Sequence, residues 1–284
     1  MNDTVLRVDR LSKSYGKVRT VEEVSFAIPK GSVTAFLGRN GAGKTTTLKM
    51  ILGFLRPDSG RIELETLGTG YVPERPVFFP WLRGREILSL TARSFGLSKR
   101  TLAKKTEEYS GSISFDTGLL SRRVETYSLG NQKKFSYLQS LVISPELMIV
   151  DEPFSGLDPV SIRDTQAMFL SLKKKGQTLV LSSHLMAETE KICDEFIILR
   201  QGRVAVHADF QDFRDRYLWA SIRLSDPDPA ELLAWSRAVR KEAGTTELLI
   251  ARNRRAVFEQ FLLKKKISAE IREVDLERIF LFFA

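Results

Sequence analysis

The first two thirds of the chain contain two kinds of apolar pattern. One kind is a short, continuous run typical of a strand whose two faces are both covered by other elements. These runs are 33–37, 147–150 and 178–182. The other kind repeats apolar positions at helical spacing, over 45–55 and through most of 84–143. Strands that alternate with helices predict an α/β domain with a mostly parallel sheet, and the range of about 84–143 predicts a helical subdomain.

A different pattern follows residue 209. Strand-like and helix-like segments alternate there on a smaller scale, and an apolar helix begins near Asp275. The predicted strands are 220–224, 247–251 and 268–274, and the predicted helices are 230–242 and 255–265. A chain of 284 residues is long enough for one large domain and one small one. We therefore expect a large domain at 1–209 and a small C-terminal α+β domain at 210–284.

Composition narrows the class of protein. The chain is 43% hydrophobic and 28% charged, which is ordinary for a folded domain, and no apolar run approaches the roughly 18 residues of a membrane helix. The N-terminus lacks the pattern of a secretion signal, and the single cysteine, Cys193, indicates a reducing compartment, so we expect a cytoplasmic protein. The formal charge of +9 favours contact with nucleotide phosphates, nucleic acid or an anionic membrane surface, without choosing among them.

Residues 38–45 read Gly-Arg-Asn-Gly-Ala-Gly-Lys-Thr and fit the pattern G-x-x-x-x-G-K-[ST] between a predicted strand and a predicted helix. Glycines let successive backbone N–H groups converge, and the helix N-terminus adds its dipole, so this loop predicts a nucleotide phosphate site. Lys44 is expected to reach the β and γ oxygens, and the Thr45 hydroxyl to contact Mg²⁺. The predicted nucleotide contacts in this segment are Gly38, Asn40, Gly41, Ala42, Gly43, Lys44, Thr45 and Thr46.

A second candidate feature is the pair of carboxylates that ends the apolar run 147–150. Asp151 suits a Mg²⁺ contact through water, and Glu152 suits polarisation of the attacking water. On its own this pattern is weak, because many strands end in an acidic turn. Its neighbours decide the interpretation.

Those neighbours resemble the ATP-binding-cassette (ABC) ATPases. Residues 127–131 (Tyr-Ser-Leu-Gly-Asn) look like the signature loop L-S-G-G-Q, and residues 155–158 (Ser-Gly-Leu-Asp) resemble the D-loop. Residues 182–184 (Ser-Ser-His) resemble the segment that ends in the switch histidine, and Tyr15 stands where the family stacks an aromatic ring on adenine. The resemblance covers residues 5 to about 206 and implies a P-loop NTPase core with an antiparallel β subdomain.

The resemblance also implies a function. Members of this kind are ATP-hydrolysing subunits that bind ATP and Mg²⁺ and drive a separate transmembrane permease from the inner face of the cell membrane. Two cassettes pair head to tail, as a homodimer or with a similar cassette, so that each ATP lies between the phosphate loop of one and Ser128 and Gly130 of the other. Lys44, Glu152 and His184 are the implied catalytic residues, with His184 at the γ-phosphate. The implied transport direction is export, and no nucleic acid is expected as a partner.

The sequence departs from the family pattern at three positions. Leu129 replaces the first glycine of the signature, and Asn131 replaces its glutamine. The segment 70–76 resembles the Q-loop with Glu74 in place of glutamine. A glutamate can still meet Mg²⁺, but it adds negative charge beside the triphosphate, so like-charge repulsion is expected either to disfavour its ionised form or to turn its side chain outward. Few residues separate Gly60 from that segment, which predicts a reduced antiparallel subdomain.

Several alternatives stay open. The apolar cluster Phe78–Leu82 suits either a packed core or a docking patch for a partner helix, and Tyr15 suits either a packed aromatic or an adenine platform. The positive charge also suits a soluble ABC ATPase that acts on ribosomes or nucleic acid, although such proteins commonly carry two cassettes. A GTPase is disfavoured because no Asn-Lys-x-Asp motif is present.

Overall fold

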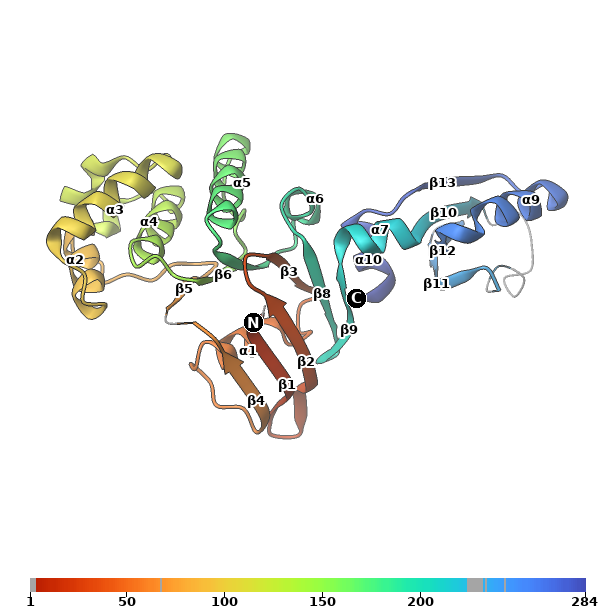
Figure 1. The fold of residues 1–284 in the computed structure, drawn as a ribbon, viewed down its shortest axis with the longest axis horizontal. Helices are drawn as coiled ribbons and strands as arrows, with labels where there is room; N and C mark the ends of the chain where they lie inside the picture. Colours follow the sequence, from red (N-terminus) through yellow and green to blue (C-terminus); the bar gives the residue numbers. More distant parts are fainter. Residues whose placement is uncertain (1–3, 67, 224–231, 233, 243) are drawn as a thin grey trace.

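The computed structural model describes residues 4–66, 68–223, 232, 234–242 and 244–284. Its central sheet has six strands (Figure 1). In order across the sheet they are β5 (Thr69–Val72), β6 (Leu147–Asp151), β7 (Thr178–Ser182), β3 (Val33–Gly38), β8 (Glu195–Arg200) and β9 (Arg203–Asp209). Every neighbouring pair is parallel except β8 and β9, which confirms the predicted mostly parallel sheet. Because β6, β7 and β3 are adjacent and parallel, their carboxyl ends meet at one edge.

Helices pack around this sheet. Those that follow its strands are α1 (Lys44–Ile51), α5 (Pro159–Lys174) and α6 (Met186–Glu190). A separate helical group, on the left in Figure 1, consists of α2 (Gly84–Ser94), α3 (Lys99–Ser112), η1 (Thr117–Ser121), η2 (Val124–Thr126) and α4 (Leu129–Leu141). Aromatic rings hold this group together, with Phe135 of α4 5.9 Å from Phe115 and 5.7 Å from Tyr127. The helices fall in the range where the sequence predicts a helical subdomain.

A three-stranded antiparallel sheet lies below the central sheet in Figure 1. Its order is β2 (Val18–Pro29), β1 (Thr4–Tyr15) and β4 (Ser59–Leu64). One apolar core joins this sheet to α1 and to the lower face of β3, with Leu6, Ile28, Phe36 and Leu48 all buried in it. Only residues 65–68 separate β4 from β5, in keeping with the small antiparallel subdomain that the sequence predicts.

The C-terminal part contains a four-stranded antiparallel sheet in the order β11, β12, β10, β13. The elements after β9 are α7 (Phe210–Arg216), β10 (Tyr217–Arg223), β11 (Ser236–Glu242), β12 (Thr245–Ala251), η3 (Arg252–Arg254), α9 (Arg255–Lys265), β13 (Ala269–Glu273) and α10 (Leu276–Phe283). α9 covers one face of the sheet through Phe258 and Leu262. α10 returns to the central part, where the amide of Leu276 donates to Oε2 of Glu190 at 2.8 Å. The boundary at residues 209 and 210 stays a prediction.

The predicted helix at 230–242 is wrong over residues 236–242, which form strand β11. β11 pairs with β12 through a turn at Gly244, whose φ of +85° suits glycine. Val239 packs into the core under α9, while Ala238 faces the opposite core. Pairing with β12 thus outweighs the local helical pattern. The beginning of the predicted helix lies partly outside the described residues.

Among the described residues, no helix combines the length and the apolar character that crossing a membrane requires.

Candidate functional site

The phosphate loop connects the end of β3, at Gly38, to the start of α1, at Lys44. Gly43 is the N-cap of α1 with φ +98°, and a Cβ there would lie 2.6 Å from the carbonyl oxygen of Thr20. A side chain at this position would therefore clash with the backbone, in a conformation that already favours glycine. The glycine spacing seen in the sequence has a steric cause.

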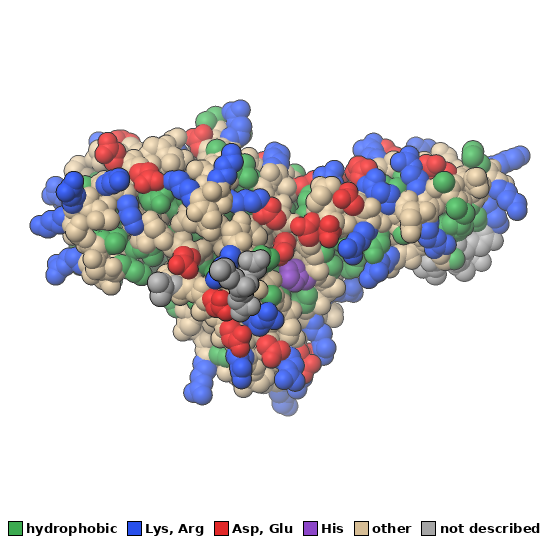
Figure 2. All heavy atoms as spheres, viewed as in Figure 1, with side chains coloured by type: hydrophobic (Ala, Val, Ile, Leu, Met, Phe, Trp, Pro, Cys, Tyr) green, Lys and Arg blue, Asp and Glu red, His purple; other side chains and the backbone are tan. Residues whose placement is uncertain are grey.

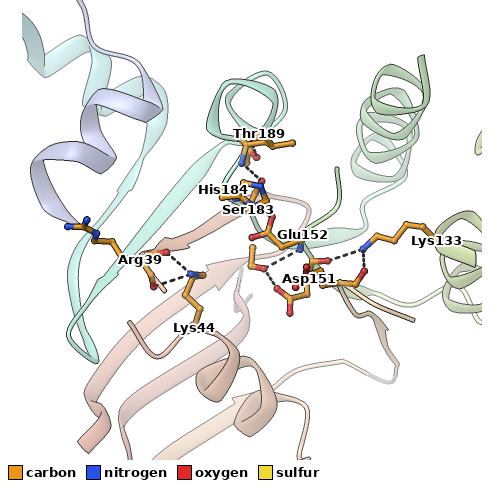
Figure 3. Close-up of polar contacts among 12 residues, drawn as sticks. Arg39, Lys44, Lys133, Asp151, Glu152, Ser183, His184 and Thr189 are labelled. Atoms are coloured by element: carbon orange, nitrogen blue, oxygen red, sulfur yellow. Dashed lines mark hydrogen bonds and ion pairs between the residues drawn. The ribbon is translucent and has the colours of Figure 1, made fainter. Parts of the chain in front are cut away.

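Lys44 folds back into this loop (Figure 3). Its Nζ donates to the carbonyl oxygen of Gly38 at 2.5 Å and to that of Arg39 at 3.3 Å. Burial lowers the pKa of Lys44, while the carboxylates of Glu152 and Asp151 act in the opposite direction. The carboxylates at the end of β6 therefore favour the charged form of this lysine.

Asp151 and Glu152 are held at the end of β6 by the neighbouring strand β7. The Ser182 hydroxyl donates to Oδ1 of Asp151, and the Glu152 amide donates to the carbonyl oxygen of Ser182 at 2.9 Å. Glu152 has φ +49°, in the left-handed region that residues other than glycine rarely adopt. The backbone thus turns sharply at the residue that is predicted to polarise water.

His184 follows β7 and contacts Glu152 directly, as Figure 3 shows. Its Nδ1 lies 2.6 Å from Oε2 of Glu152, and its backbone amide donates to the same oxygen at 3.2 Å. The Glu152 side chain is 16% exposed and that of His184 65% exposed. The structure therefore shows His184 orienting Glu152, and its contact with a γ-phosphate stays a prediction.

Thr45 and Asp151 suit a magnesium ion that arrives with a nucleotide. Mg²⁺ at such sites takes one or two protein oxygens, and phosphates and water supply the others. The hydrogen bond from Ser182 fixes the Asp151 carboxylate, and Thr45 is exposed on the first turn of α1. Within the described ranges, no three His, Cys, Asp or Glu side chains form a metal cluster of their own. Glu74, the third predicted ligand, is exposed on the segment after β5.

The remaining predicted residues lie outside this cluster. Ser128 is the N-cap of α4, where its Oγ accepts from the amide of Asn131 at 3.3 Å, and Gly130 lies in the first turn. In the part of the chain that the structure describes, no hydrogen bond joins either residue to 38–46. Tyr15 is exposed at the end of β1. The structure brings together Lys44, Asp151, Glu152 and His184, whereas the nucleotide contacts of Ser128, Gly130 and Tyr15 stay predictions.

Sequence analysis missed Lys133, which is only 3% exposed. Its Nζ donates to the carbonyl oxygen of Asp151 at 3.0 Å. Burial lowers the pKa of Lys133 to about 8, while Asp151, Glu74 and Glu152 act to raise it. Helical phase could have revealed this position, since Tyr137 and Leu141, four and eight residues later, face the core on the same stripe.

The apolar segment after Glu74 divides between core and surface. The ring of Phe78 lies 5.1 Å from that of Phe135, and Leu82 packs against the same core. Phe79 and Trp81 are each 62% exposed, with their rings 5.6 Å apart, and Val77 is 90% exposed. The packed-core interpretation is confirmed for Phe78 and Leu82, while docking of a partner helix on the exposed residues stays a prediction.

A glycine-rich loop between β3 and α1, facing carboxylates at the end of a nearby parallel strand, defines a P-loop nucleotide-binding protein. Residues 21–155 match the family described as ABC transporter. The bacitracin transport ATP-binding protein BcrA of Bacillus licheniformis is 33% identical over 81% of this chain and 78% of its own length. EcsA of Bacillus subtilis, an ABC-type transporter ATP-binding protein, is 32% identical over 78% of this chain and 94% of its own length. The chain belongs to the ABC transporter family as an ATP-binding subunit.

Solved structures agree with this assignment. A chain described as the ATP-binding subunit of an ABC transporter is 33% identical, with a TM-score of 0.69 over 74% of this chain and 92% of that one. A dimeric ATP-binding cassette in a post-hydrolysis state, bound to ADP and phosphate, has a TM-score of 0.65 over 72% of this chain and 98% of that one. At 18% identity, the second structure shows the shared fold alone.

Proposed function

We propose that this chain hydrolyses ATP within a head-to-tail homodimer and thereby drives a separate membrane permease, in the direction of export. One observation carries the proposal: Lys44, Asp151, Glu152 and His184 meet at one sheet edge, while Ser128 begins a helix elsewhere. Export is the direction that the family resemblance implies, and the name of BcrA supports transport. The direct test is Mg²⁺-dependent release of phosphate from ATP by the purified chain.

Each residue of the cluster has a distinct task in this proposal. Lys44 binds the β and γ oxygens, and Glu152 takes the position of general base for the attacking water. His184 fixes the direction of the Glu152 carboxylate through the 2.6 Å contact. Thr45 and Asp151 would hold Mg²⁺, which when bound neutralises charge on the phosphates. The task of this chain's own groups in hydrolysis is then mainly to position the phosphates and the attacking water.

The head-to-tail dimer follows from the position of Ser128. A helix N-terminus presents free amides to an anion, and α4 begins at Ser128 with its first turn at the surface. Among the described residues no hydrogen bond joins that end to loop 38–45 of the same chain, which supports a nucleotide supplied by a second chain. A two-fold pair of chains would close both sites with one interface, each α4 facing the nucleotide of the other chain.

Val77, Phe79 and Trp81 form the surface that we assign to the permease, and we call them the apolar patch. They follow Glu74 directly, so a helix docked on them would lie beside the segment that carries that carboxylate. Three exposed apolar side chains so close together are typical of a partner site. Through this contact the subunit would lie at the inner face of the membrane.

Trp81→Ala is expected to weaken co-purification with the proposed permease by about tenfold, because large exposed aromatic residues carry much of an interface's free energy. ATPase activity of the isolated chain should stay within about twofold, since Trp81 touches none of the site residues. The control is Leu263→Ala, which removes another exposed apolar side chain, from α9. Equal loss in both variants would remove the patch from the proposal.

Glu74→Gln is expected to retain or raise ATP turnover in the isolated chain, because glutamine keeps an oxygen ligand and removes a negative charge near the triphosphate. Glu74→Ala should weaken coupling to the permease more than ATP binding, since the segment joins the site to the apolar patch. ATPase assays with and without the permease compare the two variants. If Glu74→Gln were as inactive as Glu152→Gln, Glu74 would itself be a base and these assignments would be wrong.

The ribosome or nucleic-acid alternative gains no support from the visible charge distribution. Figure 2 shows Lys and Arg side chains spread over every part of this face, without the continuous basic stripe that a phosphate backbone favours. The apolar patch and the transport relative favour the permease.

A further inference from the structure

Lys133 is a buried cation whose three donors all reach backbone carbonyls. Its Nζ lies 3.0 Å from the carbonyl oxygen of Pro73, 3.4 Å from that of Glu74 and 3.0 Å from that of Asp151. Figure 3 shows the side chain extending from α4 toward Asp151. An ammonium group has three N–H donors, so each of them has one of these carbonyl partners.

The three acceptors belong to two segments that are far apart in sequence. Pro73 and Glu74 follow β5, and Asp151 ends β6. Lys133 itself lies on α4, five residues after the N-cap Ser128. A single side chain therefore ties the start of the signature helix to the Glu74 segment and to the strand end that carries both site carboxylates.

The charge of Lys133 indicates that this residue does more than fill space in the core. Removing an ammonium from water is unfavourable, and an apolar side chain would fill the same space without that penalty. The carboxylates of Asp151, Glu74 and Glu152 each stabilise the charged form of Lys133. No other buried lysine or arginine occurs among the described residues. This buried cation thus lies against the Glu74 segment and the end of β6, the two segments that carry those carboxylates.

We propose that Lys133 is a positioning residue for hydrolysis, which fixes the Glu74 segment and the end of β6 relative to α4 and balances the carboxylate of Glu74. The proposal rests on the proposed ATPase function. It links one departure from the family sequence pattern, the glutamate at position 74, to a buried cation whose Nζ contacts the carbonyl oxygen of that same residue. If Ser128 moves when it binds the nucleotide of a partner chain, α4 would move with it. The Lys133 side chain would then transmit this movement to the Glu74 segment and to the end of β6.

The test compares Lys133→Met, Glu74→Gln and the double variant with the wild type. Lys133→Met should lower kcat at least about tenfold and change KM for ATP less than about threefold, because the Lys44 contacts remain and one positioned group contributes on that scale. Adding Glu74→Gln should restore kcat about fivefold or more, since it removes the unbalanced charge. The matched control is Lys134→Met, which removes the neighbouring lysine, bonded to the carbonyl oxygen of Ser114 at 3.2 Å.

A second readout needs no nucleotide. In the free protein, hydrogen exchange over residues 70–76 should be faster in Lys133→Met than in the wild type and unchanged in Lys134→Met. If Lys133→Met does not fold, Lys133→Gln, which keeps N–H donors but no charge, should show the same rescue by Glu74→Gln. A merely structural lysine would lower stability and activity without rescue.

The outcomes separate the two proposals. Additive losses in the double variant, a raised KM with unchanged kcat, or unchanged exchange over 70–76 would each overturn the assignment of Lys133. If the folded wild type does not hydrolyse ATP, the proposed function fails, and the exchange experiment still decides whether Lys133 holds the Glu74 segment.

Discussion

Lys44→Ala is expected to reduce ATP affinity by about 10²-fold or more, because two charge-assisted hydrogen bonds to phosphate contribute roughly 3 kcal/mol together. The Lys44 ammonium bonds to the carbonyl oxygens of Gly38 and Arg39, so the side chain is already directed into the loop. Isothermal titration with ATP and Mg²⁺ measures the change. Turnover should fall with binding, since this cation also stabilises charge that develops on the γ-phosphate.

The control for this prediction is Lys49→Ala. Lys49 lies on the same helix, α1, but its side chain is exposed away from the loop. It removes the same formal charge, so a nonspecific effect of net charge would appear in both variants. Unchanged ATP affinity in Lys44→Ala would show that loop 38–45 is not the phosphate site.

Glu152→Gln is expected to keep ATP binding and slow turnover by about 10² to 10⁴, the usual contribution of a positioned base. The substitution preserves shape, and an amide oxygen can still face the 2.6 Å contact from His184, but it cannot accept the proton of water. Single-turnover assays with saturating ATP measure this loss. Glu146→Gln, at the exposed opposite end of β6, is the matched control and should hydrolyse ATP normally.

The same variant tests the dimer. Nucleotide that is bound but not hydrolysed should hold two chains together, so light scattering of Glu152→Gln in ATP and Mg²⁺ should give twice the monomer mass. Ser128→Arg in this background should abolish the dimer, because a long cation at the N-cap of α4 blocks the approach of a second chain and opposes the helix dipole. A monomer in both variants would contradict the head-to-tail arrangement.

The parts of the fold that the sequence predicted are those fixed by local chemistry. Loop 38–45 needs glycine because the backbone at Gly43 approaches Thr20, and the strand at 147–151 is apolar because both its faces are covered. Such local constraints determine which residue types are allowed, so the sequence alone predicts these parts of the fold. The order of strands then brings the ends of β3, β6 and β7 together, which no single segment reveals but which parallel topology favours.

The parts that the sequence did not predict depend on distant partners. Residues 236–242 form a strand because β12 pairs with them, although their own pattern also suits a helix. In the sequence, Lys133 looks like one of two adjacent surface lysines. Its burial depends on the carbonyls of Pro73 and Asp151, which lie 60 and 18 residues away in the sequence. In the Phe78–Leu82 cluster, the ring of Phe78 packs against Phe135, whereas the rings of Phe79 and Trp81 stay exposed.

The left-handed backbone of Glu152 limits how far this protein could be made more stable. A non-glycine residue with φ +49° carries conformational strain of roughly 1 kcal/mol, and glycine at this position would relieve it. Glycine would also remove the carboxylate that His184 orients. Selection for heat resistance and selection for turnover therefore pull in opposite directions at this residue, and a thermostable descendant would have to gain its stability elsewhere in the molecule.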